Sequence, residues 1–547
     1  MPVKLIMNFF KIILLFGLYP VFAYSQNNCS GSDNSLTREE ICETLKRATT
    51  FMVEKVSYNG GYVWSYLPDL SRRWGEMEAY RTMIWIQPPG TPKMGHIFLD
   101  AYHATYDEYY FNAAQKVAKS LIEGQLPSGG WNYMVDFAGE ESLRQWYSTI
   151  GSNGWRLEEF QHYYGNATFD DGGTAETATF LLRMYLERKD PRIKAALDKV
   201  IRLVLESQYP VGGWPQRYPP GDKFVKQGKP DYTFFITFND DVAARNIHFL
   251  ILCYHTLNDT TLLVPIHIAM DAYIKLQMPM PQPGWARQYS LDLKPAGART
   301  YEPLALSTAA TENNLFQLLY FYQLTGDRKF IERIPETINW LESLRLPASL
   351  VRGKRAYPAF VEIGTNRPVY IHRRGSNVTN GEYFADHNPA ETISHYHSIR
   401  SVRIDSLKNE YDHIKNLSPE EVTEGSILKA GNYELPQIFT EWDPVITDPN
   451  SNNLPGLKVS YEMIKKVKDD LNEEGYWPAT LRAQTNPYIG PGPKEVTTGD
   501  FATKNVGDKY DTSPYFINDP NTRCISTGVY IRNMKYLIEY LVSMEDE

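Results

Sequence analysis

The chain has 547 residues, and its 56 Lys and Arg against 65 Asp and Glu give a formal net charge of −9. Charged residues make up 22% of the sequence, hydrophobic residues 42% and aromatic residues 13%. This composition predicts a globular protein and excludes disorder as the main state. The acidic excess also argues against a nucleic-acid partner, because few cations are available to neutralise phosphates.

The first 25 residues are typical of an export signal. A short apolar run over 12–22 precedes the small-residue cleavage pattern Ala23-Tyr24-Ser25, and the run is too short to span a membrane. We therefore expect a secreted or periplasmic protein without a membrane partner, whose mature chain, 26–547, forms one catalytic domain. The four cysteines show no zinc spacing, and their pairing stays open.

Helical periodicity dominates the mature chain. The turns Arg188-Lys189-Asp190-Pro191 and Thr325-Gly326-Asp327 separate antiparallel neighbours. Strand-like runs at 357–363 and 368–372 belong to an irregular, strand-containing insert at about 346–455. The predicted helices cover 39–56, 113–124, 174–188, 191–207, 241–257, 262–277, 307–325, 329–344, 458–474 and 529–543.

A phrase recurs where predicted helices end. It reads Gln125-Leu-Pro-Ser-Gly-Gly-Trp131, then Gln208-Tyr-Pro-Val-Gly-Gly-Trp214, and more loosely Gln277 to Trp285 and Gly475-Tyr-Trp477. Each of the first two intervals has room for a loop and two helices, so the repeat predicts a mainly α protein, an (α/α) toroid of helical hairpins. The inner helices of such a ring begin at one shared cleft. The polar clusters expected to line that cleft are Asp170-Asp171, Asp240-Asp241 and Ser307-Thr308.

Four segments resemble the family 10 polysaccharide lyases, the toroidal pectate lyases, over about 115–375. They are Gly-Gly-Trp-Pro-Gln-Arg-Tyr-Pro at 212–219, Ile-Thr-Phe-Asn-Asp-Asp at 236–241, the run from Trp285 to Pro303, and Glu-Ile-Gly-Thr-Asn-Arg-Pro at 362–368. The resemblance implies calcium-assisted β-elimination on a uronic-acid polysaccharide or oligosaccharide.

Elimination beside a uronate carboxylate needs a cation or an arginine to stabilise the enolate-like charge that develops there. The resemblance implies that Asp240, with its neighbour Asp241, holds calcium, and that an arginine is the base. Arg299 and Arg367 lie in the tightest matches, so the predicted catalytic residues are Arg299, Arg367 and Asp240. A neutral arginine is rare, so this role requires a dense cationic or metal environment. Taken alone, the Asp pair could equally be a helix cap worth about 1 kcal/mol.

The substrate-binding residues are predicted by residue type and by place in the matched segments. Trp214, Trp285 and Tyr289 would stack on sugar faces, and Arg287 and Arg373 would hold carboxylates through their planar guanidinium groups. For each arginine alone, an ordinary surface or structural ion pair is the simpler interpretation.

Two positions depart from the family pattern. Ser290 stands where the family has an aspartate, with Asp292 nearby as a possible replacement metal ligand. Ala359 and Val361 stand where it has an arginine and a tyrosine, with Arg355 close by. These losses weaken the expected hold on a polymer charged at every sugar. They favour a glycan in which uronate alternates with a neutral or sulfated sugar, such as an ulvan-type polymer.

Other functions stay open at this point. The same residues suit a dehydratase that eliminates water from a terminal uronate. A non-catalytic uronate-glycan binding protein would keep only the sugar contacts, and a hydrolase for unsaturated uronides would need two inward carboxylates. His395-Tyr396-His397 could supply a metal-independent acid–base pair. Endo or exo action and the oligomeric state are also open.

Overall fold

The structure is a computed structural model, and it describes residues 36–154, 158–221, 225, 228–375, 381–393, 398–429, 435–439, 459–481, 486–492, 494, 510–512 and 521–544. The predicted export signal at 1–25 and the predicted His395-Tyr396-His397 site lie outside these residues.

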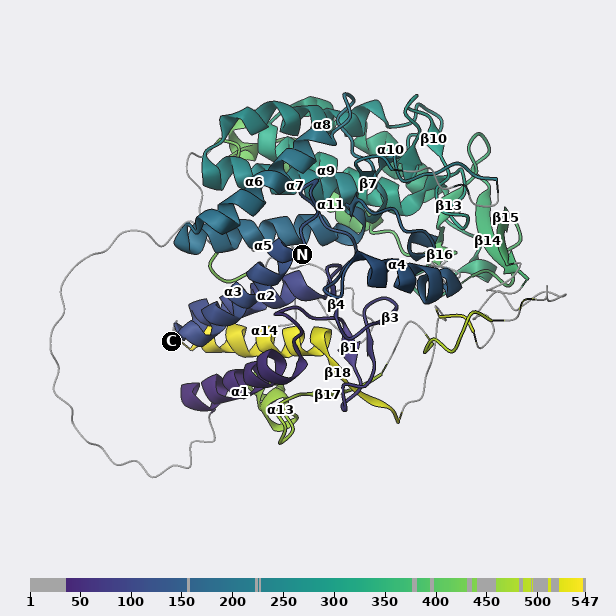
Figure 1. Ribbon diagram of the computed structural model, residues 1–547. Helices are drawn as coiled ribbons and strands as arrows, with labels where there is room; N and C mark the ends of the chain where they lie inside the picture. The colour runs from purple at the N-terminus through teal and green to yellow at the C-terminus, as the bar shows by residue number, and fades with distance from the viewer. Residues whose placement is uncertain are drawn as a thin grey trace.

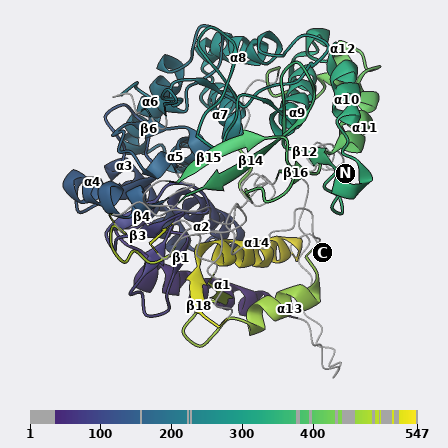
Figure 2. The same cartoon turned by 90° about the vertical axis from the view of Figure 1, so that its right-hand side faces the viewer.

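The helices form two layers, as the repeat predicts. Within the inner layer, α14 packs on α2, α2 on α5 and α5 on α7, and each of α2, α5 and α7 also packs on the outer helix that follows it. The arrangement of helical hairpins confirms the mainly α, (α/α) toroid fold (Figures 1 and 2). The inner helices are α2 (Thr91–Thr105), α5 (Gly173–Arg188), α7 (Val242–Leu257), α9 (Thr308–Thr325) and α14 (Thr527–Ser543); the outer ones are α1 (Arg38–Phe51), α3 (Glu108–Glu123), α6 (Pro191–Glu206), α8 (Leu263–Lys275), α10 (Ile334–Ser343) and α13 (Tyr461–Asp469).

Short antiparallel strands join successive hairpins. The strand before an inner helix pairs with a strand that follows an outer helix, and this happens at the same end of every hairpin. The inner-helix starts are therefore gathered at one end of the molecule, at the right in Figure 1. These pairs are β4 (Met83–Trp85) with β5 (Met134–Asp136), β6 (Ala167–Thr168) with β7 (Arg217–Tyr218), β8 (Ile236–Thr237) with β9 (Gln288–Tyr289), β11 (Leu306–Ser307) with β13 (Phe360–Val361) and β18 (Arg523–Ser526) with β17 (Pro478–Thr480).

The tryptophan of the repeated phrase connects the segment after each outer helix back to that helix. We call this contact the hairpin joint. Each indole is buried, and its Nε1 donates a hydrogen bond to a carbonyl in the last turns of the preceding outer helix. The four bonds are Trp131 to Leu121 at 2.8 Å, Trp214 to Val204 at 2.8 Å, Trp285 to Tyr273 at 2.9 Å and Trp477 to Val467 at 2.7 Å.

The predicted insert is attached to the start of α9. Strands β11, β13, β14 (Pro368–Arg374) and β15 (Glu382–Asp386) form one sheet, and the β14–β15 hairpin lies in the middle of the ring in Figure 2. The insert also holds helices that its irregular sequence did not predict, α11 (Ile404–Ile414) and α12 (Pro419–Val422). α11 packs on α9 and α10, so this part of the insert belongs to the helical layer. Its remaining strands are β12 (Tyr357–Pro358) and β16 (Ile399–Arg400).

Other short elements complete the end of the ring near the inner-helix starts: β1 (Ser65–Tyr66), β2 (Arg73–Trp74), β3 (Glu78–Ala79), β10 (Pro295–Ala296), α4 (Glu140–Thr149) and the 3₁₀ turns Glu158–Phe160, Asp170–Gly172 and Asn239–Asp241. Within the described part of the chain, no helix combines the length and the apolar composition that crossing a bilayer requires.

Candidate active site

Two equivalent turns supply the acidic residues of the site. Asp170-Asp171-Gly172 leads from β6 into α5, and Asn239-Asp240-Asp241 leads from β8 into α7. Asp171 and Asp240 both have the left-handed backbone, with φ of 50° and 51°. This conformation costs a non-glycine residue about 1 kcal/mol or more, so the surrounding fold must hold both turns in place.

The two turns bring three carboxylates together. Oxygens of Asp170, Asp171 and Asp240 lie within 4.8 Å of one another; we call these residues the carboxylate cluster. Asp170 is fully buried, whereas the side chain of Asp240 is 23% exposed, so the cluster opens to solvent on that side. Burial, followed by the charge of Asp170, raises the pKa of Asp171 and of Asp240 well above the usual range.

Arg299 is inserted beside the cluster and is almost completely buried. Its Nη2 lies 2.5 Å from Asp170, its Nε 3.1 Å from Glu159, and its Nη1 3.4 Å from Glu302 and 3.8 Å from Asp240. Burial alone would lower the pKa of Arg299, but the carboxylates of Glu159, Asp170 and Glu302 raise it well above the usual range. Arg299 is therefore a firm cation among the described residues, which do not supply the cationic environment that a neutral arginine base requires.

Two glutamates that sequence reasoning missed hold the Arg299 segment. Glu158 accepts hydrogen bonds from the backbone N–H and the hydroxyl of Thr300, and Glu159 accepts one from Arg299. Burial, and then the charge of Glu76, raise the pKa of Glu159 to about 7 although Arg299 opposes the shift. Both glutamates come from a short turn after α4, which carries no repeated pattern that could have marked them.

Polar groups from other elements complete the surroundings of the cluster. Gln87, just before α2, donates through Nε2 to Asp171 at 2.5 Å and to Glu76 at 2.8 Å. The hydroxyl of Tyr133 donates to Asp170 at 2.5 Å. The starts of three inner helices, α2, α5 and α7, therefore meet at this site.

The carboxylate cluster fits a divalent cation. Oδ1 of Asp170 is buried and no donor among the described residues reaches it, and the other two carboxylates are held close enough to repel one another. Carboxylate oxygens at this spacing are the ligands that calcium prefers. Asp170, Asp171 and Asp240 would hold the ion.

The predicted set of metal ligands is therefore corrected in part. Asp240 lies in the cluster, but Asp241 is directed to α9, where its Oδ1 accepts a hydrogen bond from Asn313 at 3.2 Å. Asp292 lies on the exposed β9–β10 turn and pairs with Lys294 at 3.0 Å. Asp170 and Asp171, which were predicted only to line the cleft, are the residues whose carboxylates lie beside Asp240.

The predicted aromatic sugar platform is wrong. Trp214, Trp285 and Tyr289 are all 0% exposed. The two indoles form the hairpin joints described above, and the hydroxyl of Tyr289 accepts a hydrogen bond from the backbone N–H of Ala286 at 2.9 Å. These rings are core residues and cannot stack on a sugar without unfolding the joints.

Of the other predicted arginines, one lies at the site and two lie on or beside β14. Arg287 belongs to the site, because its Nη1 donates to Asn239 at 2.9 Å and to Glu302 at 3.2 Å. Arg373 is buried on β14, opposite Tyr383 of β15. Arg367 lies on the exposed turn between β13 and β14, and none of its described contacts is with the cluster, which contradicts its catalytic role.

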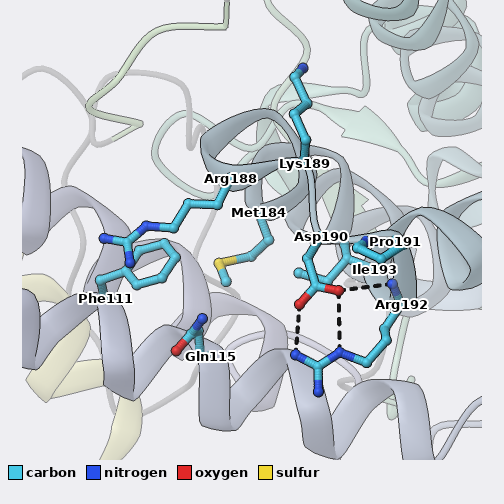
Figure 3. A pocket seen from close by; sticks show the side chains of 9 residues that line it. All are labelled: Phe111, Gln115, Met184, Arg188, Lys189, Asp190, Pro191, Arg192 and Ile193. Atoms are coloured by element: carbon cyan, nitrogen blue, oxygen red, sulfur yellow. Dashed lines mark hydrogen bonds and ion pairs between the residues drawn. The ribbon is translucent and has the colours of Figure 1, made fainter.

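A surface pocket of about 410 Å³ lies elsewhere, at the turn between α5 and α6 (Figure 3). The 16 residues of α5 separate this turn from the carboxylate cluster by about 24 Å. Its two arginines already have partners, Arg188 with Glu108 at 2.5 Å and Arg192 with Asp190 at 2.7 Å. The pocket is therefore not the candidate site.

A family model matches the part of the chain that contains the candidate site. Residues 140–385, which include the carboxylate cluster, Arg299 and Arg287, match the family described as pectic acid lyase. No curated protein matches the chain.

Three solved structures are similar at low identity. A family 10 polysaccharide lyase from Cellvibrio cellulosa is 18% identical with a TM-score of 0.34, covering 56% of this chain and 85% of its own. A mutant of that lyase in complex with trigalacturonic acid is 19% identical with a TM-score of 0.30, covering 46% and 83%. Cellobiose 2-epimerase from Spirochaeta thermophila is 10% identical with a TM-score of 0.42, covering 93% and 97%. TM-scores of this size do not bear on function, whereas the family match shows that the chain resembles the pectic acid lyases over residues 140–385.

Proposed function

We propose that the protein is an exported, calcium-assisted lyase that performs β-elimination at a uronic acid residue of a polysaccharide or oligosaccharide. The observation that carries the proposal is the contact of Arg299 with the carboxylate cluster, beside Arg287 on Asn239 and Glu302, from segments far apart in the chain. Arginines beside a cation site are the groups that stabilise the enolate-like charge of this reaction. Export rests on the sequence pattern of residues 1–25.

Each residue of the site has a place in this chemistry. A calcium ion at Asp170, Asp171 and Asp240 would neutralise these carboxylates and help to acidify the proton on carbon 5 of the uronate. All three nitrogens of the Arg299 guanidinium face carboxylates: Nε lies 3.1 Å from Glu159, Nη2 2.5 Å from Asp170, and Nη1 3.4 Å from Glu302 and 3.8 Å from Asp240. We assign Nη1 of Arg299, which lies beside the partly exposed Asp240, to the substrate. With the surrounding carboxylates neutralised by a bound cation, the guanidinium would first lose one proton to solvent, and Nη1 would then take the proton from carbon 5 as the oxygen on carbon 4 leaves. We assign Arg287 to the substrate carboxylate.

The substrate proposal follows from the departures. Ser290 is partnered by Asp292 on an exposed turn, and Ala359 is buried, so no described residue at these two positions replaces the side chains of the family. We therefore propose a glycan in which uronate alternates with a neutral or sulfated sugar.

The test is a panel of uronate glycans, followed at the absorbance of the unsaturated uronate with calcium present and after chelation. We expect turnover of alternating rhamnose–uronate substrates that chelation abolishes. Strong turnover of polygalacturonate alone would contradict the substrate. Loss of water without chain shortening, measured by mass spectrometry, would identify a terminal dehydratase. Binding without any turnover would identify a glycan-binding protein.

A further inference from the structure

Arg245 is a third arginine at the site, next to the carboxylate cluster. It lies on α7, one turn after Asp241, and its guanidinium rests against Gly172, the residue that follows Asp171. A Cβ atom at Gly172 would come within 2.5 Å of Nη1 of Arg245. Gly172 thus leaves the space that this guanidinium occupies.

The charge of Arg245 is not compensated within the described part of the chain. No ion pair or hydrogen bond joins it to a described residue, and its Nε is buried without an acceptor. The acidic residues near enough in sequence or space to pair with Arg245 have other partners. Asp241, four residues earlier, accepts a hydrogen bond from Asn313, and Glu176 pairs with Lys93 at 2.6 Å. A partly buried guanidinium whose N–H groups lack acceptors lowers the stability of the fold unless a ligand accepts hydrogen bonds from it.

Arg245 carries the positive charge at this place, because the basic side chains next to it are neutral or paired with an acid. His248, one turn further along α7, is neutral at physiological pH, because burial and then the charge of Arg245 lower its pKa to about 4. Lys93, on α2, is balanced by Glu176. Since Arg245 itself is only partly buried, its guanidinium keeps a side that an incoming group can reach.

We propose that Arg245 is a specificity-determining residue that binds an oxyanion, a carboxylate or a sulfate ester, on the sugar next to the uronate that is eliminated. The planar guanidinium fork matches both groups. Arg287 and Arg299 pair with Glu302, whereas Arg245 lies against Gly172, next to Asp171. These two different places beside the cluster would contact two successive sugars. The assignment rests on the proposed function for the identity of the ligand, and on the uncompensated guanidinium for the site itself.

The test compares Arg245→Gln with the matched control Arg192→Gln, an exposed arginine at the far end of α5 that pairs with Asp190. For each variant, kcat/KM is measured on uronate oligosaccharides whose neighbouring sugar is neutral, carboxylated or sulfated. Arg245→Gln should lose at least about tenfold more on a charged neighbour than on a neutral one, mainly through KM, and Arg192→Gln should behave as wild type. The charged substrate with the larger loss identifies the natural group.

Equal losses on charged and neutral neighbours, or no loss at all, would overturn the assignment. Calorimetric titration of the metal-free protein with glucuronate and with a sulfated monosaccharide provides a second test that requires no turnover. Weaker binding of either anion by Arg245→Gln, at an unchanged melting temperature, supports the site even if no glycan is cleaved. Identical binding by wild type and variant refutes it whatever the protein's activity.

Discussion

Calcium binding at the carboxylate cluster can be tested with the substitution Asp171→Asn. Three oxygens within 4.8 Å would repel strongly if all were ionised. At an effective dielectric constant of about 20, each pair of charges at this separation costs about 3.5 kcal/mol. The metal-free protein avoids this cost by keeping protons on the cluster, as the raised pKa values of Asp171 and Asp240 indicate. Calcium must displace these protons.

The sign of the pH dependence follows from these shifts. Because the folded-state pKa values of Asp171 and Asp240 are raised, the metal-free protein is most stable below their ordinary values near 4 and loses stability as the pH rises through the raised ones. Calcium should therefore bind more tightly as the pH rises. At a hundredfold excess over its Kd it should stabilise the fold by about 2.7 kcal/mol.

Thermal melting with calcium and with chelator, at about pH 5 and pH 8, measures both effects. Asp171→Asn should raise the metal-free melting temperature at the higher pH, because one negative charge is gone. The variant should also bind calcium at least about tenfold more weakly, a loss of about 1.4 kcal/mol. Titrations in two buffers of different ionisation enthalpy should show proton release on binding to wild type. A calcium-induced shift of the same size in Asp171→Asn would refute the assignment of this ligand.

Three further predictions concern single side chains. Arg299→Lys should lower kcat by about 10²-fold or more while the fold persists, because the charge remains but the guanidinium fork is lost; activity and circular dichroism would be measured together, and near-normal turnover would contradict the role. Trp214→Phe should lower stability by about 1 kcal/mol through loss of the hydrogen bond to Val204, with KM unchanged; a rise in KM would restore the sugar-stacking role. Glu159, whose pKa is raised to about 7, should cost stability as the pH rises through that value, so Glu159→Gln should flatten the melting temperature between about pH 6 and 8; an unchanged slope would contradict the shift.

The helical fold could be predicted from periodicity, except where burial removes the pattern. α2 was missed although it is a central inner helix, because 12 of its 15 residues, among them Lys93, His96 and Asp100, are buried on all sides. A helix surrounded in this way has no polar face, and amphipathic periodicity is the signal that identifies helices in a sequence. α11 was missed for a different reason, since its surroundings in the insert suggest an irregular connection.

Residues of the candidate site could be predicted where a segment of several residues matches the family pattern. Arg299 and Asp240 lie at the site, whereas Arg367 is similar only in sequence. A signal for Asp171 was available: Thr-Phe-Asp-Asp-Gly at 168–172 and Thr-Phe-Asn-Asp-Asp at 237–241 occupy the same place in two hairpins, so Asp171 is the counterpart of Asp240. The same comparison would have assigned the repeated tryptophans to the joints, because they recur in every copy of the phrase. Glu158 and Glu159 had no such signal, because their contacts with Arg299 and Thr300 cross about 140 residues of chain.

The charges around Arg299 lead to a last prediction, that uronate and calcium bind cooperatively. Five carboxyl groups, those of the cluster with Glu159 and Glu302, face the two guanidinium groups of Arg299 and Arg287, and without a metal protons on Asp171 and Asp240 keep this set near balance. A divalent cation in the cluster would offer an anionic sugar a positive centre to contact and should strengthen uronate binding. Linkage then requires that uronate strengthen calcium binding by the same factor, expected at 5-fold to 150-fold for a coupling of about 1–3 kcal/mol. Titration of Arg299→Lys, which is expected to bind without turnover, with calcium in the presence and absence of a uronate oligosaccharide measures the factor. Independent binding of the two ligands would mean that the sugar carboxylate lies away from the cluster, and the elimination proposed for this site could not proceed there.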